Sequence, residues 1–164
     1  MGGIEIERKF LIDSSELPFD IEKYEKIEIF QAYISKNPTI RIRKTGKGCF
    51  LTVKSAILGA ADNISRNEHE ISITENEFNN LREKIDIESV PIEKTRYIVP
   101  LDCGLTAELD KYYSSLSGLY TVEVEFPNIE SARAFSPPMW FSHEKTEDER
   151  YSNSSLSFFG IPRE

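Results

Sequence analysis

The stretch that decides the fold is Glu5-Ile6-Glu7-Arg8-Lys9, near the start of the chain. In a β-strand, successive side chains point to opposite faces, so Glu5, Glu7 and Lys9 share one face and Ile6 and Arg8 share the other. Taken alone, this pattern is typical of a surface strand whose charged face lies in water. The same alternation recurs along the chain, however, and that recurrence favours a different interpretation.

Seven further segments alternate in the same way and are separated by turn signals such as Asn37-Pro38 and Gly46-Lys47-Gly48. The strands predicted in this way are residues 4–12, 26–35, 39–45, 49–55, 64–73, 90–100, 104–113 and 119–126. A helix is predicted to begin at Thr74, where Glu77 three residues later completes a capping box. Two further helices are predicted, at residues 129–135 and 153–159.

Length and composition indicate one ordinary globular domain, which we place at residues 1–164. The 164 residues are 39% hydrophobic and 29% charged, and the net charge is −8. That charge argues against nucleic acid or an anionic membrane as a partner, but it does not exclude a small anion in a local basic cavity. We expect Cys49 and Cys103 to be reduced core residues, and we expect a cytoplasmic protein, because the sequence contains no signal peptide and no apolar run of membrane-spanning length.

The charged residues of the predicted strands sort by sign. The first, seventh and eighth strands supply mainly acids, and the third, fourth and sixth supply bases. The aligned bases are Lys9, Arg41, Arg43, Lys54, Arg66, Lys94 and Arg96, and the aligned acids are Glu5, Glu7, Glu68, Glu70, Glu108, Asp110, Glu123 and Glu125. Eight antiparallel strands can close into a barrel that takes one set of side chains inside. We therefore predict an α+β fold, with an eight-stranded antiparallel closed β-barrel (a tunnel) and peripheral helices over its apolar outer faces.

A charged interior is costly unless its charges pair with each other or with a ligand, so this arrangement favours a function over a purely stabilising role. Converging Arg and Lys side chains suit an extended polyanion, and adjacent carboxylates suit Mg²⁺ or Mn²⁺. A metal that bridges phosphate oxygens beside such cations fits phosphoryl transfer. Structural ion pairing remains an alternative, above all for Glu108 and Asp110, and Tyr33 has an alternative role as a packing residue.

The ordered set of motifs resembles the CYTH family, also called triphosphate tunnel metalloenzymes. The E-x-E-x-K signature at residues 5–9 lies near the N-terminus, as it does in that family, and the resemblance extends over nearly the whole chain. The further matching segments are Gln31-Ala32-Tyr33, Arg41-Ile42-Arg43, Leu51-Thr52-Val53-Lys54, Arg66-Asn67-Glu68-His69-Glu70, Lys94-Thr95-Arg96-Tyr97, Ala107-Glu108-Leu109-Asp110, Val122-Glu123-Val124-Glu125-Phe126 and Arg150-Tyr151-Ser152-Asn153. Lys145 departs from the family's tail, which often has valine there.

The resemblance implies a role for each group of aligned residues. It implies that Glu5, Glu7 and one or both of Glu123 and Glu125 bind the catalytic metal. Glu68, Glu70, Glu108 and Asp110 would position water or a second metal. The seven aligned bases would grip phosphates, and Tyr33 matches a tyrosine proposed to assist catalysis together with a lysine, for which we take Lys9.

The function predicted from these features is metal-dependent hydrolysis of triphosphate, most simply inorganic triphosphate, by an enzyme whose only expected partner is this small polyanionic substrate. One alternative is a class IV adenylate cyclase, which the family also contains, although no nucleoside-pocket signature is evident and Trp140 is the only tryptophan. Another alternative is a noncatalytic polyphosphate-binding module, which would release no phosphate. The oligomeric state stays open.

Overall fold

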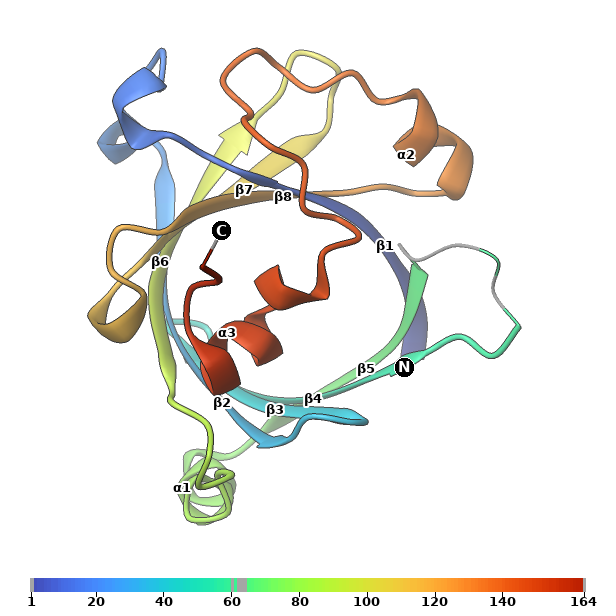
Figure 1. Cartoon of the computed structure of the whole chain (residues 1–164). Helices are drawn as coiled ribbons and strands as arrows, with labels where there is room; N and C mark the ends of the chain where they lie inside the picture. Colours follow the sequence, from blue (N-terminus) through green and yellow to red (C-terminus); the bar gives the residue numbers. More distant parts are fainter. Residues whose placement is uncertain (1, 60, 62–64, 164) are drawn as a thin grey trace.

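Eight antiparallel strands form a closed barrel in the order β1-β5-β4-β3-β2-β6-β7-β8 (Figure 1). The computed structural model describes residues 2–59, 61 and 65–163. The strands are β1 (Gly2–Leu11), β2 (Glu25–Ser35), β3 (Thr39–Thr45), β4 (Gly48–Ala56), β5 (Ser65–Ile73), β6 (Ile92–Pro100), β7 (Thr106–Tyr112) and β8 (Tyr120–Glu125). The predicted closed barrel is therefore confirmed.

The described residues also form three α-helices and four short 3-10 turns. The helices are α1 (Glu75–Arg82), α2 (Ile129–Ala134) and α3 (Asn153–Phe159), and the 3-10 turns are η1 (Ser14–Glu16), η2 (Ile21–Lys23), η3 (Ser114–Leu116) and η4 (Glu149–Tyr151). The predicted capping box of α1 is present, because Thr74 Oγ1 accepts from the Glu77 backbone and Glu77 accepts from the Thr74 backbone. None of the helices in the described residues is long and apolar enough to span a membrane.

The limits of some strands differ from the prediction, because the backbone there does not take part in hydrogen bonding between strands. Strand β6 begins at Ile92, not at Val90, because Pro91 between them has no N–H to donate. Strand β7 begins at Thr106, since Gly104 takes a positive φ of 85° in the preceding turn. The predicted start of the fifth strand, residue 64, lies outside the described residues.

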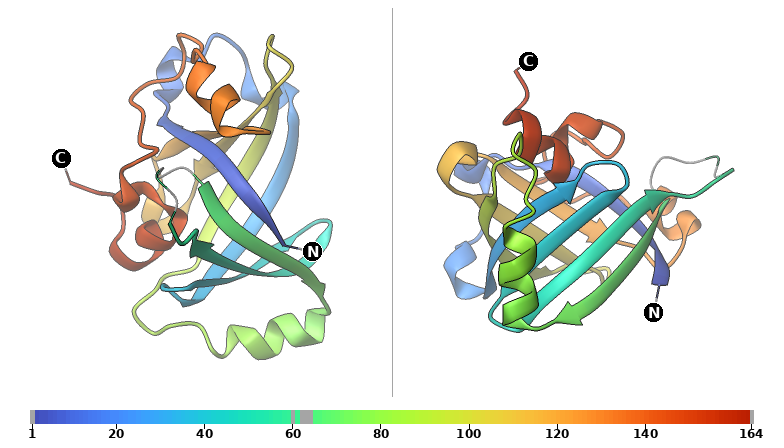
Figure 2. Two further views of the ribbon diagram at one scale, coloured as in Figure 1. Left: turned by 90° about the vertical axis from the view of Figure 1, so that its right-hand side faces the viewer. Right: turned by 90° about the horizontal axis from the view of Figure 1, so that it is seen from below.

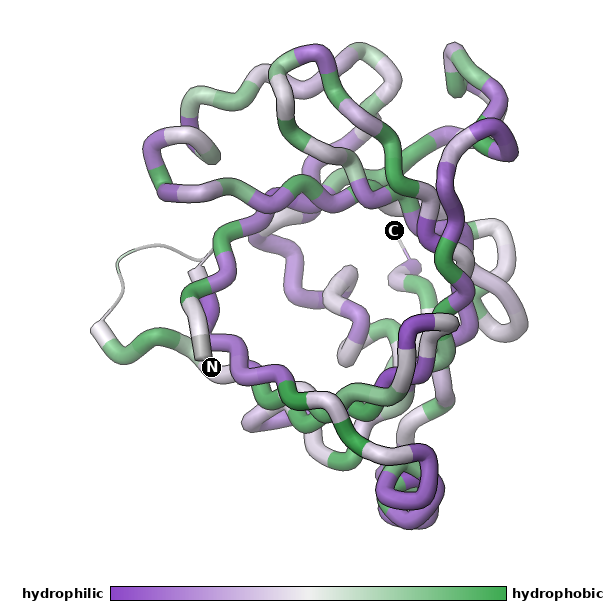
Figure 3. Tube along the Cα trace, turned by 180° about the vertical axis from the view of Figure 1, so that it is seen from behind, coloured by the Kyte–Doolittle hydropathy of each residue, from purple (hydrophilic) through white to green (hydrophobic). Residues whose placement is uncertain are grey.

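Strand register sends the charged faces into the interior of the barrel, which we call the lumen. Directly paired residues share a face, and the pairs Glu5↔Arg66, Glu7↔Glu125 and Lys9↔Glu123 all join lumen positions. The backbone trace accordingly alternates between hydrophilic and hydrophobic residues along many of the strands (Figure 3).

Apolar residues on the outside of the barrel are covered by helices and loops. Phe78 of α1 is 1% exposed and packs with Ala32, Ile42 and Cys49 on strands β2, β3 and β4. On the other side, α2 and the segment around Phe141 cover strands β1, β7 and β8. Two outer-face side chains, Ile4 and Ile71, stay exposed at 64% and 56%. The outer faces are thus covered over only part of the barrel.

The two cysteines do not share one environment. Cys49 is buried beneath α1, as expected. Cys103 is exposed, so its prediction as a core residue is wrong. The reason is local, because Cys103 lies in the turn between β6 and β7, where side chains face water.

The C-terminal tail closes one end of the barrel. Residues 142–146 first run beside the second half of β1, where Leu11 N donates to His143 O at 2.9 Å and Lys145 N donates to Lys9 O at 2.8 Å. The tail then turns through η4 into α3, which lies across the barrel opening in Figure 1 and at one end of the barrel in Figure 2. An apolar cluster, here called the end cap, joins the tail to the barrel. It consists of Tyr33, Ile92, Tyr112, Leu116, Leu119, Tyr151 and Leu156.

Candidate active site

The predicted site residues all occupy lumen-facing positions of the barrel strands. Pairing places each base or acid across from another lumen residue, as in Arg96↔Asp110, Lys54↔Glu68 and Tyr33↔Arg41. The lumen is therefore lined by both signs of charge, as the sequence indicated. How these charges pair decides which of them remain available for a ligand.

One tight cluster joins β6 and β7. Asp110 is fully buried and accepts from Lys94 Nζ at 2.7 Å and from Arg96 Nε and Nη2 at 2.7 and 2.8 Å. Arg96 also donates to Glu108 at 2.7 Å. Burial alone would raise the pKa of Asp110, yet Arg96 and Lys94 hold it below its usual value. Burial lowers the pKa of Lys94 to about 8. The geometry thus favours the ion-pair alternative for Asp110 over a metal-ligand role, because both of its oxygens are already occupied.

The arginines of β3 are less completely paired. Arg43 donates to Glu70 at 2.8 Å, and Thr52 donates to the same oxygen at 3.0 Å. Arg41 reaches Glu68 and Glu70 only at 4.0 and 3.9 Å. The buried Nε atoms of both arginines have no hydrogen-bond partner among the described residues. Burial, followed by the adjacent Arg41 charge, lowers the pKa of Arg43. Both guanidinium groups therefore keep an unpartnered buried donor, and Arg41 also lacks a close acidic partner.

Strand β1 supplies two further ion pairs of the lumen. Lys9 Nζ lies 3.0 Å from Glu123 and also donates to the backbone oxygen of Tyr151 at 3.0 Å. Despite its burial, Lys9 has a raised pKa because of Glu123, whereas the pKa of Glu123 is held well below its usual value by Lys9. Glu5 accepts from Lys54 at 2.8 Å.

Glu7 is half-buried and, in contrast to Glu5 and Glu123, makes no ion pair among the described residues. Burial raises the pKa of Glu7 well above its usual range, and the neighbouring Glu123 and Glu5 raise it further. Burial likewise raises the pKa of Glu5, and the neighbouring Glu68 raises it further. Glu125, paired across from Glu7, also has a raised pKa through burial and Glu5.

Neighbouring carboxylates that raise one another's pKa are the donor chemistry that suits a hard divalent cation, because the cation relieves their mutual repulsion. The residues on β1 and β8 therefore fit the metal that the family resemblance implies. In the described part of the chain, however, no three His, Cys, Asp or Glu side chains already converge as a ligand set. The metal assignment therefore rests on the proximity of Glu7 to Glu123 and of Glu5 to Glu68.

The remaining predicted residues have distinct environments. Arg66 donates to the backbone oxygen of Ser65 at 2.9 Å and has no acidic partner within residues 2–59, 61 and 65–163. Tyr33 is 1% exposed, packs in the end cap, and accepts from Gln31 Nε2 at 3.1 Å. Its packing role is therefore evident, and its catalytic role stays a prediction.

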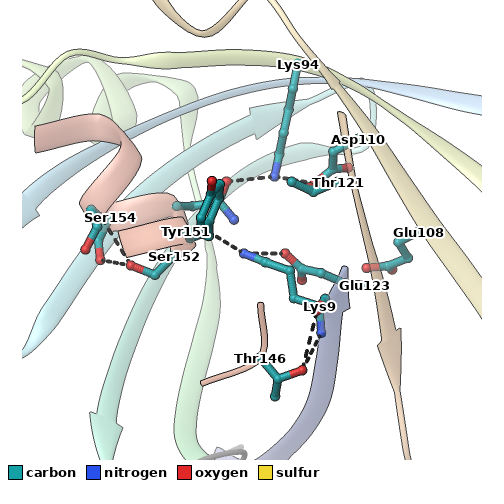
Figure 4. Close-up of polar contacts among 12 residues, drawn as sticks. Lys9, Lys94, Glu108, Asp110, Thr121, Glu123, Thr146, Tyr151, Ser152 and Ser154 are labelled. Atoms are coloured by element: carbon teal, nitrogen blue, oxygen red, sulfur yellow. Dashed lines mark hydrogen bonds and ion pairs between the residues drawn. The ribbon is translucent and has the colours of Figure 1, made fainter. Parts of the chain in front are cut away.

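The structure adds residues that the sequence analysis did not assign. Asn153 Oδ1, at the start of α3, accepts from Lys94 Nζ at 3.3 Å and from Tyr112 Oη at 2.9 Å. Figure 4 shows Tyr151 beside Lys9, with Thr146 near the Lys9 backbone. The tail motif at residues 150–153 was visible in the sequence, but a backbone oxygen such as that of Tyr151 leaves no side-chain signal.

Comparisons with known proteins agree with this architecture. The barrel and its charged lumen define a tunnel class of β-barrel, and the sequence model of the CYTH domain matches residues 3–134. The chain belongs to the CYTH family. An inorganic triphosphatase of Nitrosomonas europaea is 39% identical over 157 residues, which cover 93% of this chain and 96% of that protein. An inorganic triphosphatase of Acetivibrio thermocellus is 34% identical over 154 residues, which cover 94% of this chain and 93% of that protein.

Solved structures show the same fold. A crystal structure of an inorganic triphosphatase superposes with a TM-score of 0.67 at 34% identity and covers 97% of both chains. A Hippeastrum protein described as a putative adenylyl cyclase with dominant triphosphatase activity superposes with a TM-score of 0.54 at 17% identity, covering 79% of this chain and 82% of its own. At that identity, the second likeness concerns the fold alone.

Proposed function

We propose that this protein is a divalent-metal-dependent triphosphatase whose preferred substrate is inorganic triphosphate. The observation that carries the proposal is the pair of buried Nε donors on Arg41 and Arg43 that have no partner among the described residues. Guanidinium groups with an unpartnered N–H donor in a lumen suit phosphate oxygens, which accept from both N–H groups of one fork. The two relatives described above as inorganic triphosphatases support the same substrate.

The basic and the acidic residues of the lumen have different roles in this proposal. The bases bind and orient the phosphates, and Arg41 and Arg66, which have no acidic partner closer than 3.9 Å among the described residues, make the first contacts. Mg²⁺ or Mn²⁺ would be held by Glu7 and Glu123, with Glu5 and Glu125 alongside, and would supply charge neutralisation of the phosphate oxygens. Glu70 accepts hydrogen bonds from Arg43 and Thr52, and Glu68 lies 4.0 Å from Arg41. Both acids can there orient a water molecule for attack on phosphorus.

Adenylate cyclisation is the second candidate activity, and the lumen does not favour it. The bases of the lumen suit phosphate, whereas cyclisation also needs a purine site and a base at the ribose. Trp140, a candidate for purine stacking, instead packs edge-on against Phe19 and Phe141 on the outside of the barrel.

One substrate panel tests the proposal. Triphosphate, ATP, thiamine triphosphate and long polyphosphate are each supplied with Mg²⁺ or Mn²⁺ while phosphate and cyclic AMP are followed. We expect the highest kcat/KM for triphosphate and no cyclic AMP. Cyclic AMP formed from ATP faster than phosphate from triphosphate would replace this function by the cyclase, and binding without phosphate release would replace it by a polyphosphate-binding module.

Arginine variants connect the activity to the lumen. Arg41→Ala should lower kcat/KM for triphosphate by about tenfold or more, which corresponds to the loss of a charged hydrogen bond. Arg41→Lys should restore only part of this loss, because the planar fork is absent. Arg133→Ala, on the exposed face of α2, is the matched control and should leave kcat/KM unchanged.

A further inference from the structure

We propose that the end cap makes the tunnel blind, so that the site binds the free terminus of a phosphate chain and not its interior. This inference rests on the proposed function, since it concerns how the same lumen admits its polyanion. It assigns a specificity role to η4 and α3, which neither the lumen motifs nor the family match at residues 3–134 covers.

The first support is the way in which the tail is held across the opening. Tyr151 and Leu156 are 3% and 2% exposed and pack against apolar lumen residues at that end of the barrel. The Val90 backbone N–H donates to Ser157 O at 2.8 Å, which ties the last turn of α3 to the segment before β6. A phosphate chain that left the lumen at this end would have to displace this packing.

The second support is the chemistry of the inner surface of the tail. Tyr151 O accepts from Lys9 (Figure 4), and Asn153 Oδ1 accepts from Lys94. Both acceptors are neutral, so the tail fixes these two ammonium groups without adding a negative charge opposite them. At this end of the lumen the tail therefore adds no acid to the two that already pair with these ammonium groups, Glu123 with Lys9 and Asp110 with Lys94.

The third support is a gradient of exposure along the lumen. Next to the end cap, the side chains of Lys94 and Asp110 are 2% and 0% exposed. Farther from it, Glu108 and Glu70 are 39% and 33% exposed. Water, and therefore substrate, reaches the charged residues from the end opposite α3.

The number of proteins bound per polyphosphate chain distinguishes a lumen closed at one end from a lumen through which a chain can pass. A linear polyphosphate has two termini whatever its length, so a blind site allows at most two protein molecules per chain. A lumen open at both ends lets the protein slide inward and collect along the chain, so the bound number rises with chain length. The experiment is titration calorimetry of the full chain with linear polyphosphates of increasing length, in chelator so that turnover does not intervene.

We expect the saturating ratio to stay at or below two proteins per chain as the polyphosphate lengthens. A ratio that grows with length, or no binding of long chains at a concentration where triphosphate binds, overturns the inference and leaves the triphosphatase proposal intact. That proposal fails separately, if triphosphate is not hydrolysed in the presence of metal.

Variants of α3 extend the test. Leu156→Ala removes an apolar anchor of the end cap without touching a charged lumen residue, and terminal helices open readily. We expect this variant to bind more proteins per long chain than the wild type does. Ser154→Ala, on the same helix with its hydroxyl beside Ser152, is the control and should keep the wild-type ratio. An unchanged ratio in a folded Leu156→Ala variant whose α3 exchanges amide protons rapidly would contradict a stop at α3.

Discussion

Substitution of Glu7 gives the most direct test of the metal assignment. A raised pKa means that the folded chain disfavours the ionised form, so the charged carboxylate at neutral pH opposes folding. Glu7→Gln keeps the shape and a hydrogen-bonding group while it removes the charge. We expect turnover to fall by orders of magnitude while the melting temperature in chelator holds or rises.

The two readouts for Glu7 are needed together. In the Glu7→Gln variant, turnover measured with Mg²⁺ should fall, whereas the melting temperature measured in chelator should rise or stay unchanged. Glu16→Gln, on the exposed turn η1, is the control and should alter neither. Near-normal turnover by the Glu7 variant would remove Glu7 from the metal site.

Asp110 should behave in the opposite way. Its two oxygens are occupied by Lys94 and Arg96, and neutralising it leaves two buried cations with reduced compensation. We expect Asp110→Asn to cost about 3–5 kcal/mol in the free energy of unfolding, the usual consequence of breaking a buried ion pair. Denaturant unfolding measures this cost, and a variant that keeps wild-type stability but loses metal affinity would return Asp110 to the metal ligands.

At the scale of elements, α1 is a cover and not part of the site. Phe78 is its buried anchor on strands β2, β3 and β4, and the residues that it touches lie on the outer face. Phe78→Ala should therefore destabilise the protein by about 3–5 kcal/mol. Among molecules that remain folded, kcat and KM should be unchanged, as an assay well below the melting temperature would reveal. A large rise in KM would mean that the outer face controls the lumen.

The elements also show where sequence patterns stop being informative. Alternation in segments such as residues 5–9 and 39–45 predicted the strands, and the capping box predicted α1, because these signals are local. The division of the acids into paired ones, such as Asp110, and an unpaired one, Glu7, depends on cross-strand register, which no single strand encodes. The contact of Tyr151 O with Lys9 was equally hidden, because every residue has a backbone oxygen.

At the scale of the whole molecule, the lumen should be inactive without a divalent cation. Its acids crowd together at Glu7 and Glu123, and the ion pair of Lys9 with Glu123 leaves Glu7 without a cationic partner among the described residues. We expect chelator to abolish triphosphate hydrolysis and Mg²⁺ or Mn²⁺ to restore it, with less activity in Ca²⁺, whose larger coordination shell positions phosphate differently. Phosphate release from metal-stripped protein, with metal content verified, checks this expectation, and undiminished turnover would contradict it.

The position of β1 between its partners has a consequence for how the chain folds. Its first half pairs with β5, its second half pairs with β8, and residues 142–146 lie along the same second half. The second half of β1 therefore acquires its neighbours only after β8 and residues 142–146 have been made. Such distant pairings raise the contact order, and all-β domains of this kind fold in about milliseconds to seconds, not microseconds. The barrel should consequently close after synthesis, with Glu7 and Lys9 in water until β8 arrives.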